Sequence, residues 1–162
     1  MIDTQVIDHC QTLIKSARTL ERSFSQPLCV LDTNITLDLW HFDDPSCRPI
    51  KSLIENEEII PVGHFDTLVE LADVLSRPHF QLSEEGCQLV LERWLHHTAI
   101  FEGALREDSY CRDSDDDKFF ALAQATRASF LFSKDKKVLK ARGKAKRFGC
   151  KVLTPEQFKS AI

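Results

Sequence analysis

The sequence predicts an α/β protein in which a mainly parallel sheet lies between two layers of helices. Short apolar runs of strand length alternate along the chain with amphipathic stretches of helical length. The segments between successive strands hold about ten or more residues, which is what crossover connections between parallel strands require. With 43% hydrophobic and 28% charged residues, the 162-residue chain has enough apolar surface for one compact domain.

The N-terminal segment is expected to form a helical arm that precedes the main domain. Apolar side chains recur every three or four positions between residues 4 and 22, and Asp3 or Thr4 can cap this helix. A break at residues 23–27 separates the helix from the first strand. We therefore divide the chain into an arm at residues 1–27 and a main domain at residues 28–162.

The main domain is expected to begin with a buried strand and to continue with alternating elements. Leu28-Cys29-Val30-Leu31 has the length and composition of such a strand, and Thr33 or Asn34 can cap the next helix. The predicted elements are a strand at 28–31, helices at 35–41 and 50–56, a strand at 58–62, helices at 64–76 and 83–97, a short strand at 101–104, a helix from 115 or 116 to 127, a strand at 129–132, a helical segment at 136–148, a strand at 150–153 and a helix from 155.

Composition narrows the class of protein. The net charge is −4, which by itself argues against a protein that coats nucleic acid through bulk charge. No stretch approaches the roughly 18 apolar residues of a membrane helix, and residues 1–10 lack the basic flank and apolar run of a signal peptide. We therefore expect a soluble, cytoplasmic protein with no membrane partner.

The six cysteines are expected to be reduced and largely buried. They are scattered, they lie mostly in apolar contexts, and no pair has the C-x-x-C spacing of a zinc ribbon. His96 and His97 are adjacent and would point about 100° apart on a helix, which makes joint chelation awkward. A disulfide framework and a zinc site are both disfavoured.

Acidic residues follow the predicted strands where a parallel α/β protein builds its site, beyond the carboxyl ends of the strands. Asp32 directly follows the first strand, and Asp135 lies three residues after Phe132. Asp116 stands in an acidic run at a helix start, and Glu70 lies in the middle of the helix after the second strand. Each acid alone is compatible with a helix cap or a solvated side chain. Their joint placement favours a single site.

The chemistry that such a site suggests is metal-assisted hydrolysis of a phosphodiester. Four carboxylates at one sheet edge would repel one another and raise each other's pKa unless a cation neutralised them. Hard oxygen ligands select Mg²⁺ or Mn²⁺. Such an ion can lower the pKa of a bound water and stabilise charge on a phosphoryl oxygen.

Five short motifs occur along the sequence. Each motif alone is a weak indication of a protein family, but their order and spacing together are quite specific. They are LCVLDTN at 28–34, ELADVLSRP at 70–78, CRDSDDDKFFALA at 111–123, LFSKD at 131–135 and VLTPEQF at 152–158. Together they resemble the PIN domain family, and most closely its bacterial toxin branch, the VapC-like ribonucleases of toxin–antitoxin pairs. The resemblance covers residue 28 to about residue 160.

The resemblance implies a Rossmann-like α/β/α fold and a Mg²⁺- or Mn²⁺-dependent endoribonuclease. The residues to which it assigns metal binding and catalysis are Asp32, Glu70, Asp116 and Asp135. Asp113 and Asp117 are close enough to the third acid to share its role. Asn34 and Ser133 match polar positions that support the first and fourth acids. The implied partners are RNA in single-stranded regions, a cognate antitoxin and a second copy of the chain.

A basic run follows the fourth acid. Residues 134–151 contain nine Lys or Arg and one acid, a local charge of +8, and the rest of the chain carries −12. Such a run is often only a solvated face, but this one begins where an RNA backbone would approach the acids. Backbone contacts are expected from Lys134, Lys136, Lys137 and Lys140. Lys137 also departs from the family, because many relatives carry an acid at that position.

Two other functions compete with a ribonuclease. An Asp-nucleophile phosphohydrolase of the haloacid dehalogenase kind also has an Asp at a strand end. Its reaction requires a second Asp two residues later, and this chain has Asn34 at that position. A non-catalytic RNA-binding or scaffolding PIN-like protein would be expected to lose one or more of the four acids, and this sequence retains all four. The metal-dependent ribonuclease is therefore the leading hypothesis.

Overall fold

A computed structural model describes residues 2–21 and 24–161 of the chain. The strands are β1 Arg18–Thr19, β2 Leu28–Leu31, β3 Ile60–Gly63, β4 Ala99–Ile100, β5 Phe130–Phe132 and β6 Lys151–Leu153. The α-helices are α1 Thr4–Ile14, α2 Thr33–Trp40, α3 Arg48–Glu55, α4 Phe65–Leu75, α5 Glu84–His97, α6 Asp117–Thr126, α7 Lys136–Lys140, α8 Arg142–Lys146 and α9 Pro155–Ala161. Short 3-10 helices are η1 Pro45–Cys47, η2 Pro78–Phe80 and η3 Ser114–Asp116.

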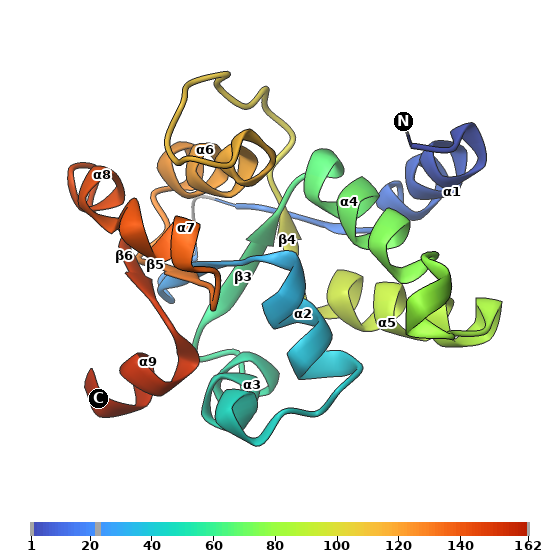
Figure 1. Ribbon diagram of the computed structural model, residues 1–162, viewed down its shortest axis with the longest axis horizontal. Coiled ribbons are helices and arrows are strands. Elements are labelled where there is room, and N and C mark those ends of the chain that lie inside the picture. Colours follow the sequence, from blue (N-terminus) through green and yellow to red (C-terminus); the bar gives the residue numbers. More distant parts are fainter. Residues whose placement is uncertain (1, 22–23, 162) are drawn as a thin grey trace.

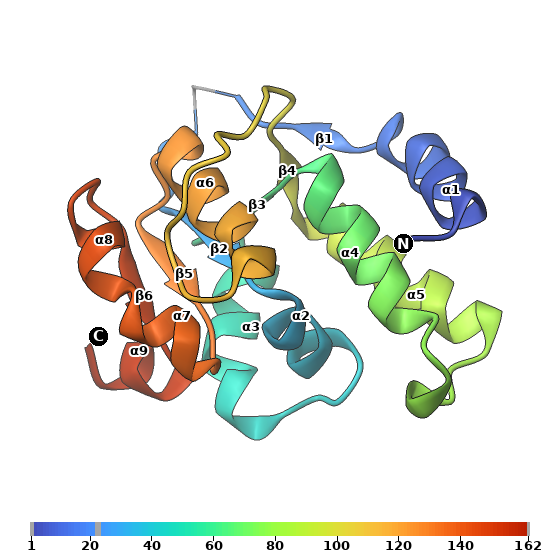
Figure 2. The same cartoon turned by 45° about the horizontal axis from the view of Figure 1, so that its top comes forward.

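Within the described residues the strands form one six-stranded sheet in the order β1-β4-β3-β2-β5-β6. Every neighbouring pair is parallel. Figures 1 and 2 show helices on both sides of this sheet. The predicted α/β sandwich with a parallel sheet is confirmed.

The sheet separates two apolar cores because successive side chains of a strand point to opposite faces. In β2, Cys29 and Leu31 pack into a core with α1 to α5 and α9, whereas Val30 packs into a second core with α6, α7 and α8. Both faces are therefore covered, as a parallel sheet requires. The loops after β2, β3 and β5 emerge at the carboxyl ends of the strands, which is the edge where a parallel sheet places its site.

The predicted helix at residues 4–22 is wrong in its second half. The helix ends at Ile14, and Arg18–Thr19 instead forms β1 on the edge of the sheet, with Arg18 opposite Ala99. The Arg18 guanidinium binds Glu57 at 3.0 Å and the carbonyl of His97 at 3.2 Å, which holds the segment extended. The N-terminal arm is thus packed into the fold, since α1 also buries Cys10 against α4.

Three other predicted boundaries are corrected by hydrogen bonding. The strand expected at 101–104 is Ala99–Ile100, which pairs with the end of β3. The helix after β2 begins at Thr33, because Asp32 and not a later residue caps it. The basic segment at 136–148 is two short helices that meet at Ala141, whose backbone (φ −88°, ψ 7°) leaves the helical region.

Two features bear on the class of protein. All six cysteines are free thiols, four of them buried. No helix in the described part of the chain combines the length and the apolar character needed to cross a bilayer.

Candidate active site at the carboxyl edge of the sheet

Two of the predicted acids lie just beyond the ends of neighbouring strands and are held by backbone groups. Asp32 follows β2, is 5% exposed, and accepts the N–H of Ile35 at 2.9 Å as the N-cap of α2. Asp135 follows β5 and accepts the N–H of Lys137 at 2.8 Å as the N-cap of α7. Because β2 and β5 are neighbours in the sheet, the two acids leave it side by side.

Ser133 connects these two acids. Its side chain is fully buried, its Oγ accepts the N–H of Asp135 at 3.0 Å, and it lies close enough to Asp32 to lower the pKa of that carboxyl group. The supporting role of Ser133 stays a prediction that these contacts favour. We call Asp32, Ser133 and Asp135 the strand-end group.

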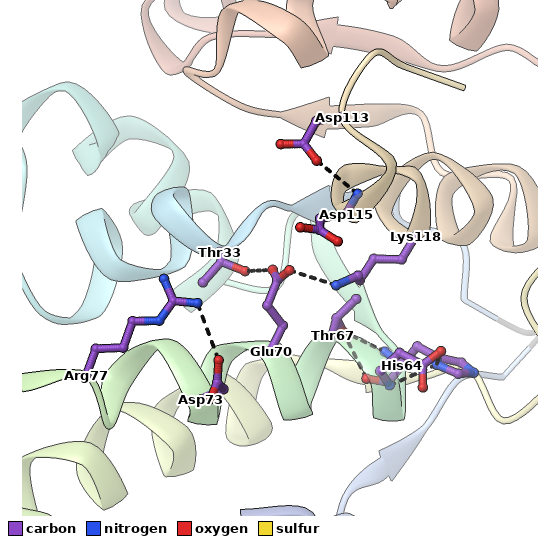
Figure 3. Close-up of polar contacts among 10 residues, drawn as sticks. Thr33, His64, Thr67, Glu70, Asp73, Arg77, Asp113, Asp115 and Lys118 are labelled. Carbon is purple, nitrogen blue, oxygen red and sulfur yellow. Dashed lines mark hydrogen bonds and ion pairs between the residues drawn. The ribbon is translucent and has the colours of Figure 1, made fainter. Parts of the chain in front are cut away.

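The other two acids come from helical segments, and one of them, Glu70, belongs to a network of side chains. Glu70 of α4 accepts a hydrogen bond from Lys118 Nζ at 2.7 Å on Oε1 and one from the Thr33 hydroxyl on Oε2 (Figure 3). Glu70 and Lys118 are only 20% and 25% exposed, so solvent screens their ion pair less than one on the surface. We call Glu70, Asp116 and Lys118 the helix group.

The acidic residues before α6 make different contacts. Asp117 Oδ1 accepts the N–H groups of Tyr110 and Cys111, both at 2.9 Å, and so fastens the preceding loop. Asp113 caps η3 by accepting the N–H of Asp115 at 3.0 Å. Asp116 makes no capping hydrogen bond, which leaves its carboxylate available. Of the three acids that the sequence left open, Asp116 is therefore the best candidate for the third position.

The acids of the two groups are electrostatic neighbours. Burial raises the pKa of Asp32 to about 7, and the charges of Asp116 and Asp135 add to this rise, while its hydrogen bonds to Ser133 and Ile35 lower it. Burial also raises the pKa of Asp116 to about 6, and the nearby Asp113, Asp135 and Glu70 contribute to that rise. Such mutual repulsion is what the sequence predicted for carboxylates gathered at one edge.

A divalent cation suits these residues by the chemistry of their donors. Buried carboxylate oxygens that repel one another are the ligands that a hard cation would neutralise. As the described side chains lie, no three His, Cys, Asp or Glu residues form a group ready to hold a metal ion. Glu70 faces Lys118, and Asp32 and Asp135 face backbone N–H groups. The residues fit the ion by the chemistry of their oxygen donors, and binding would require their carboxylates to turn toward it.

The predicted basic contacts fall into two kinds. Lys134 forms ion pairs with Asp38 at 2.8 Å and Asp44 at 2.9 Å, so it ties the loop after β5 to α2 and to the start of η1. Although burial opposes the effect, these two acids raise the pKa of Lys134. Lys136 and Lys140 are exposed on α7. Lys137 is exposed as well, with its Nζ 3.8 Å from Asp113.

Sequence reasoning placed Asn34 near the first acid but missed Thr33 and Lys118. Asn34 lies in the first turn of α2 with an exposed side chain, and its supporting role stays a prediction. The sequence indicates Thr33 only as a possible helix cap, and in the structure its hydroxyl donates a hydrogen bond to Glu70. Lys118 meets Glu70 across 48 positions of sequence, so no local spacing pattern could have shown the pair.

The fold and the site together define a Rossmann-like α/β/α protein with an acidic site at the carboxyl ends of its strands. The family model described as the PIN domain matches residues 29–137, a span that contains all four predicted acids. The chain therefore belongs to the PIN domain family, as the resemblance of its motifs predicted. PIN domains are typically nucleases and generally use divalent metal ions.

A solved structure shares the fold. The chain is similar to a chain in the crystal structure of VapBC2 from Rickettsia felis bound to a DNA fragment from their promoter, with a TM-score of 0.51 and 17% sequence identity. The likeness covers 78% of this chain and 98% of that one. No curated protein matches the chain.

Proposed function

We propose that this protein is a metal-dependent endoribonuclease that hydrolyses RNA phosphodiester bonds with Asp32, Glu70, Asp116 and Asp135. The observation that carries the proposal is the placement of Asp32 and Asp135 side by side after the neighbouring parallel strands β2 and β5, where the charge of Asp116 adds to the burial that raises the pKa of Asp32. Carboxylates that raise each other's pKa at such an edge favour a cation-binding, catalytic role over helix capping alone.

The chain's own residues hold and orient the acids. Asp32 is fixed by the N–H of Ile35 and by Ser133, and Asp135 by the N–H of Lys137 and by the same serine. A bound Mg²⁺ or Mn²⁺ would lower the pKa of a water and offset charge on a phosphoryl oxygen. Burial of Asp32 keeps competing water from one side of this centre.

RNA is the proposed substrate because a basic face adjoins the acids. The +8 segment at residues 134–151 starts at the loop that carries Asp135, and Lys136, Lys137 and Lys140 are exposed on α7. Lysines spaced along a short helix can follow a phosphate backbone without reading its sequence. Single-stranded regions are the proposed targets, since a flexible backbone can enter the acidic edge.

We further propose that the nuclease is the toxin of a toxin–antitoxin pair and acts as a homodimer in the cytoplasm. The shared fold with a chain of VapBC2 supports a cognate antitoxin as the protein partner. The test is growth of a bacterial host that expresses the chain. Growth arrest by the wild type but not by Asp32→Asn, with rescue by a small neighbouring gene product, supports the toxin role, and unimpaired growth contradicts it.

The nuclease proposal is tested with single-stranded RNA in Mn²⁺ or Mg²⁺. We expect cleavage by the wild type and its loss in Asp32→Asn and Asp116→Asn. Asp115→Asn is the matched control, because Asp115 is an exposed acid of the same run, and it should cleave normally. Equal cleavage in all variants, or none by the wild type across metals and pH, contradicts the proposal. RNA binding without cleavage would favour a non-catalytic RNA-binding protein, and hydrolysis of a small phosphomonoester would favour the phosphohydrolase.

A further inference from the structure

Lys134 lies in the loop after β5, between Ser133 and Asp135 of the strand-end group. Its ammonium group binds two acids of a different segment, with Nζ 2.8 Å from Asp38 Oδ2 and 2.9 Å from Asp44 Oδ2. We call Lys134, Asp38 and Asp44 the lysine clasp. The clasp therefore connects the loop that carries one proposed catalytic acid to the end of α2 and the turn that follows it.

The two acids of the clasp are held in place by other contacts. The N–H of Asp44 donates to the carbonyl of Asp38 at 2.9 Å, which keeps the two residues adjacent. Asp44 Oδ1 accepts the N–H and the hydroxyl of Ser46, both at 2.9 Å, and Oδ2 is left for Lys134. The hydrogen bond from Lys134, together with those from Ser46, lowers the pKa of Asp44 to about 2. The lysine thus meets two neighbouring acids whose backbone is already fixed.

The clasp closes a ring of contacts that contains both strand-end acids. α2 begins at its N-cap, Asp32, and Asp38 lies in its last turn. The strands β2 and β5, which precede Asp32 and Asp135, are hydrogen-bonded neighbours. One side of the ring is therefore the sheet, and the other is α2 with the clasp. Movement of the Asp135 loop away from α2 would require the two ion pairs of Lys134 to break.

These contacts favour a structural role for Lys134 over a contact with RNA. Two carboxylates take up two of the three N–H donors of its ammonium group. The Asp38 and Lys134 side chains are 16% and 37% exposed, so solvent screens this pair less than one that is fully on the surface. A phosphate that approached Lys134 would also be repelled by both acids. The exposed Lys136 and Lys140 have no such competition from a printed ion pair in the described residues.

We propose that Lys134 is a positioning residue, whose clasp with Asp38 and Asp44 holds the Asp135 loop against α2 and so fixes the placement of Asp135 relative to Asp32. The catalytic part of this proposal rests on the proposed function, because it assigns a role to a residue near the same site. The structural part is independent of catalysis and of any bound ion.

The first test measures hydrogen exchange at the two amides around Asp135 by nuclear magnetic resonance. The N–H of Asp135 donates to Ser133 Oγ, and the N–H of Lys137 donates to Asp135 Oδ1. Lys134→Met keeps the length of the side chain and removes its charge. It should lower the protection factors of both amides by at least about 10-fold in the full chain without metal or RNA, because the loop loses two charged hydrogen bonds. Lys134→Arg, which keeps the charge, should retain most of the protection.

Two further variants show whether the effect comes from the clasp. Lys136→Met is the matched control, because Lys136 lies on the other side of Asp135 and joins no salt bridge within the described ranges, and it should leave both protection factors unchanged. In an Asp38→Asn background, Lys134→Met should have a smaller effect than in the wild type, since one partner of the lysine has lost its charge. Unchanged protection in Lys134→Met, or an equal fall at the amides of β2, overturns the proposed local role.

The second test separates positioning from RNA binding. Lys134→Met should lower kcat for RNA cleavage by about 10- to 100-fold with KM unchanged, as is typical when a residue that orients a catalytic group is lost. Lys134→Arg should restore kcat, whereas Lys136→Met should raise KM with kcat unchanged. A raised KM with unchanged kcat in Lys134→Met overturns positioning and assigns the lysine to RNA binding.

The two readouts distinguish failure of this inference from failure of the function on which it rests. No cleavage by the wild type overturns the proposed function, and the protection factors then decide the clasp by themselves. Normal cleavage with unchanged protection in Lys134→Met overturns the clasp and leaves the nuclease standing. If Lys134→Met does not fold, as judged by circular dichroism, Lys134→Gln takes its place with the same expected results.

Discussion

The two halves of the acidic edge are built in different ways. In the strand-end group, backbone N–H groups and the buried Ser133 fix the carboxylates, and strands β2 and β5 set their separation. In the helix group, long side chains from α4 and α6 hold one another through an ion pair. Turning a capping carboxylate away gives up its hydrogen bond to the helix N-terminus, which costs about 0.5–2 kcal/mol, whereas the Glu–Lys pair can rearrange by rotation of two long side chains. The strand-end group is therefore held more firmly than the helix group, which can adapt more easily to ion and substrate.

The largest expected effect is on RNA cleavage, which should fall more when an acid of the strand-end group is changed than when Glu70 of the helix group is changed. Asp32→Asn should lower RNA cleavage by at least about 100-fold, because removing even a supporting partner of a metal ligand typically costs about 10- to 100-fold. Glu70→Gln should cost less, about 10-fold, because Lys118 already occupies that carboxylate. Asp73→Asn is the control on the same helix, where Asp73 pairs with Arg77. Equal losses in Asp32→Asn and Glu70→Gln would contradict the division.

The second effect is on the pH dependence of stability without metal. The folded-state pKa of Asp32 is raised to about 7, so between pH 4 and 7 the folded state binds more protons than the unfolded state, and stability falls as pH rises. The free energy of unfolding should drop by on the order of 2 kcal/mol between about pH 5 and pH 8, measured by urea denaturation with a chelator present. Asp32→Asn should flatten this dependence, and a wild type that gains stability over the same range would contradict the assignment.

Adjacent acids of the run before α6 give a third comparison. Asp117→Ala should lower the free energy of unfolding by about 1–3 kcal/mol, because the N–H groups of Tyr110 and Cys111 lose a charged acceptor. Asp116→Ala should cost little stability and abolish cleavage, since its carboxylate makes no capping bond. Urea denaturation and the RNA assay, run on both variants, check the contrast. A stability loss in Asp116→Ala as large as that in Asp117→Ala would refute it.

The smallest effect concerns the lysines that follow the strand-end group. Lys136→Ala or Lys140→Ala should each reduce the slope of log RNA affinity against log salt by about 0.7, as expected for loss of one contact to a single-stranded backbone. Lys134→Ala should leave that slope unchanged, because Lys134 is bound to Asp38 and Asp44. Filter binding over a range of salt concentrations measures all three. A loss of slope in Lys134→Ala alone would reverse the assignment.

The strand-end part of the site could be predicted from sequence because local rules create it. An apolar run that ends in polar residues predicts a strand end, and Asp32 and Asp135 lie just beyond such runs. The cap of α2 was not predicted correctly, because Thr33 and Asn34 are capping residues too and Asp32 takes that position. The same rules found the sheet, the two faces and most helices. Glu70 was grouped with these acids by its position in the helix after the second strand, although local patterning alone describes it as a solvated helix residue, and the family resemblance assigned it a role.

The helix part and the N-terminal edge could not be predicted because long-range contacts decide them. The Lys118–Glu70 pair and the fastening of Tyr110 by Asp117 depend on how α4, α6 and the intervening loop meet. Periodicity continues past Ile14, so it predicted a longer helix, but β4 offers unpaired backbone groups that extend Arg18–Thr19. Whether these residues form a helix or a strand is therefore decided by tertiary contacts and cannot be read from the segment itself.

The pairing of β1 with β4 has a consequence for synthesis of the protein. Arg18 leaves the ribosome well before its partner Ala99 has been made. At about 5–20 residues per second, the segment waits roughly 4 to 16 seconds with its backbone unpaired and its apolar helix uncovered. The edge strand is therefore completed late, after the β2–β3 pair that carries Asp32 has already emerged. Chaperones that bind nascent chains would meet this segment before its partner strand β4 has been made.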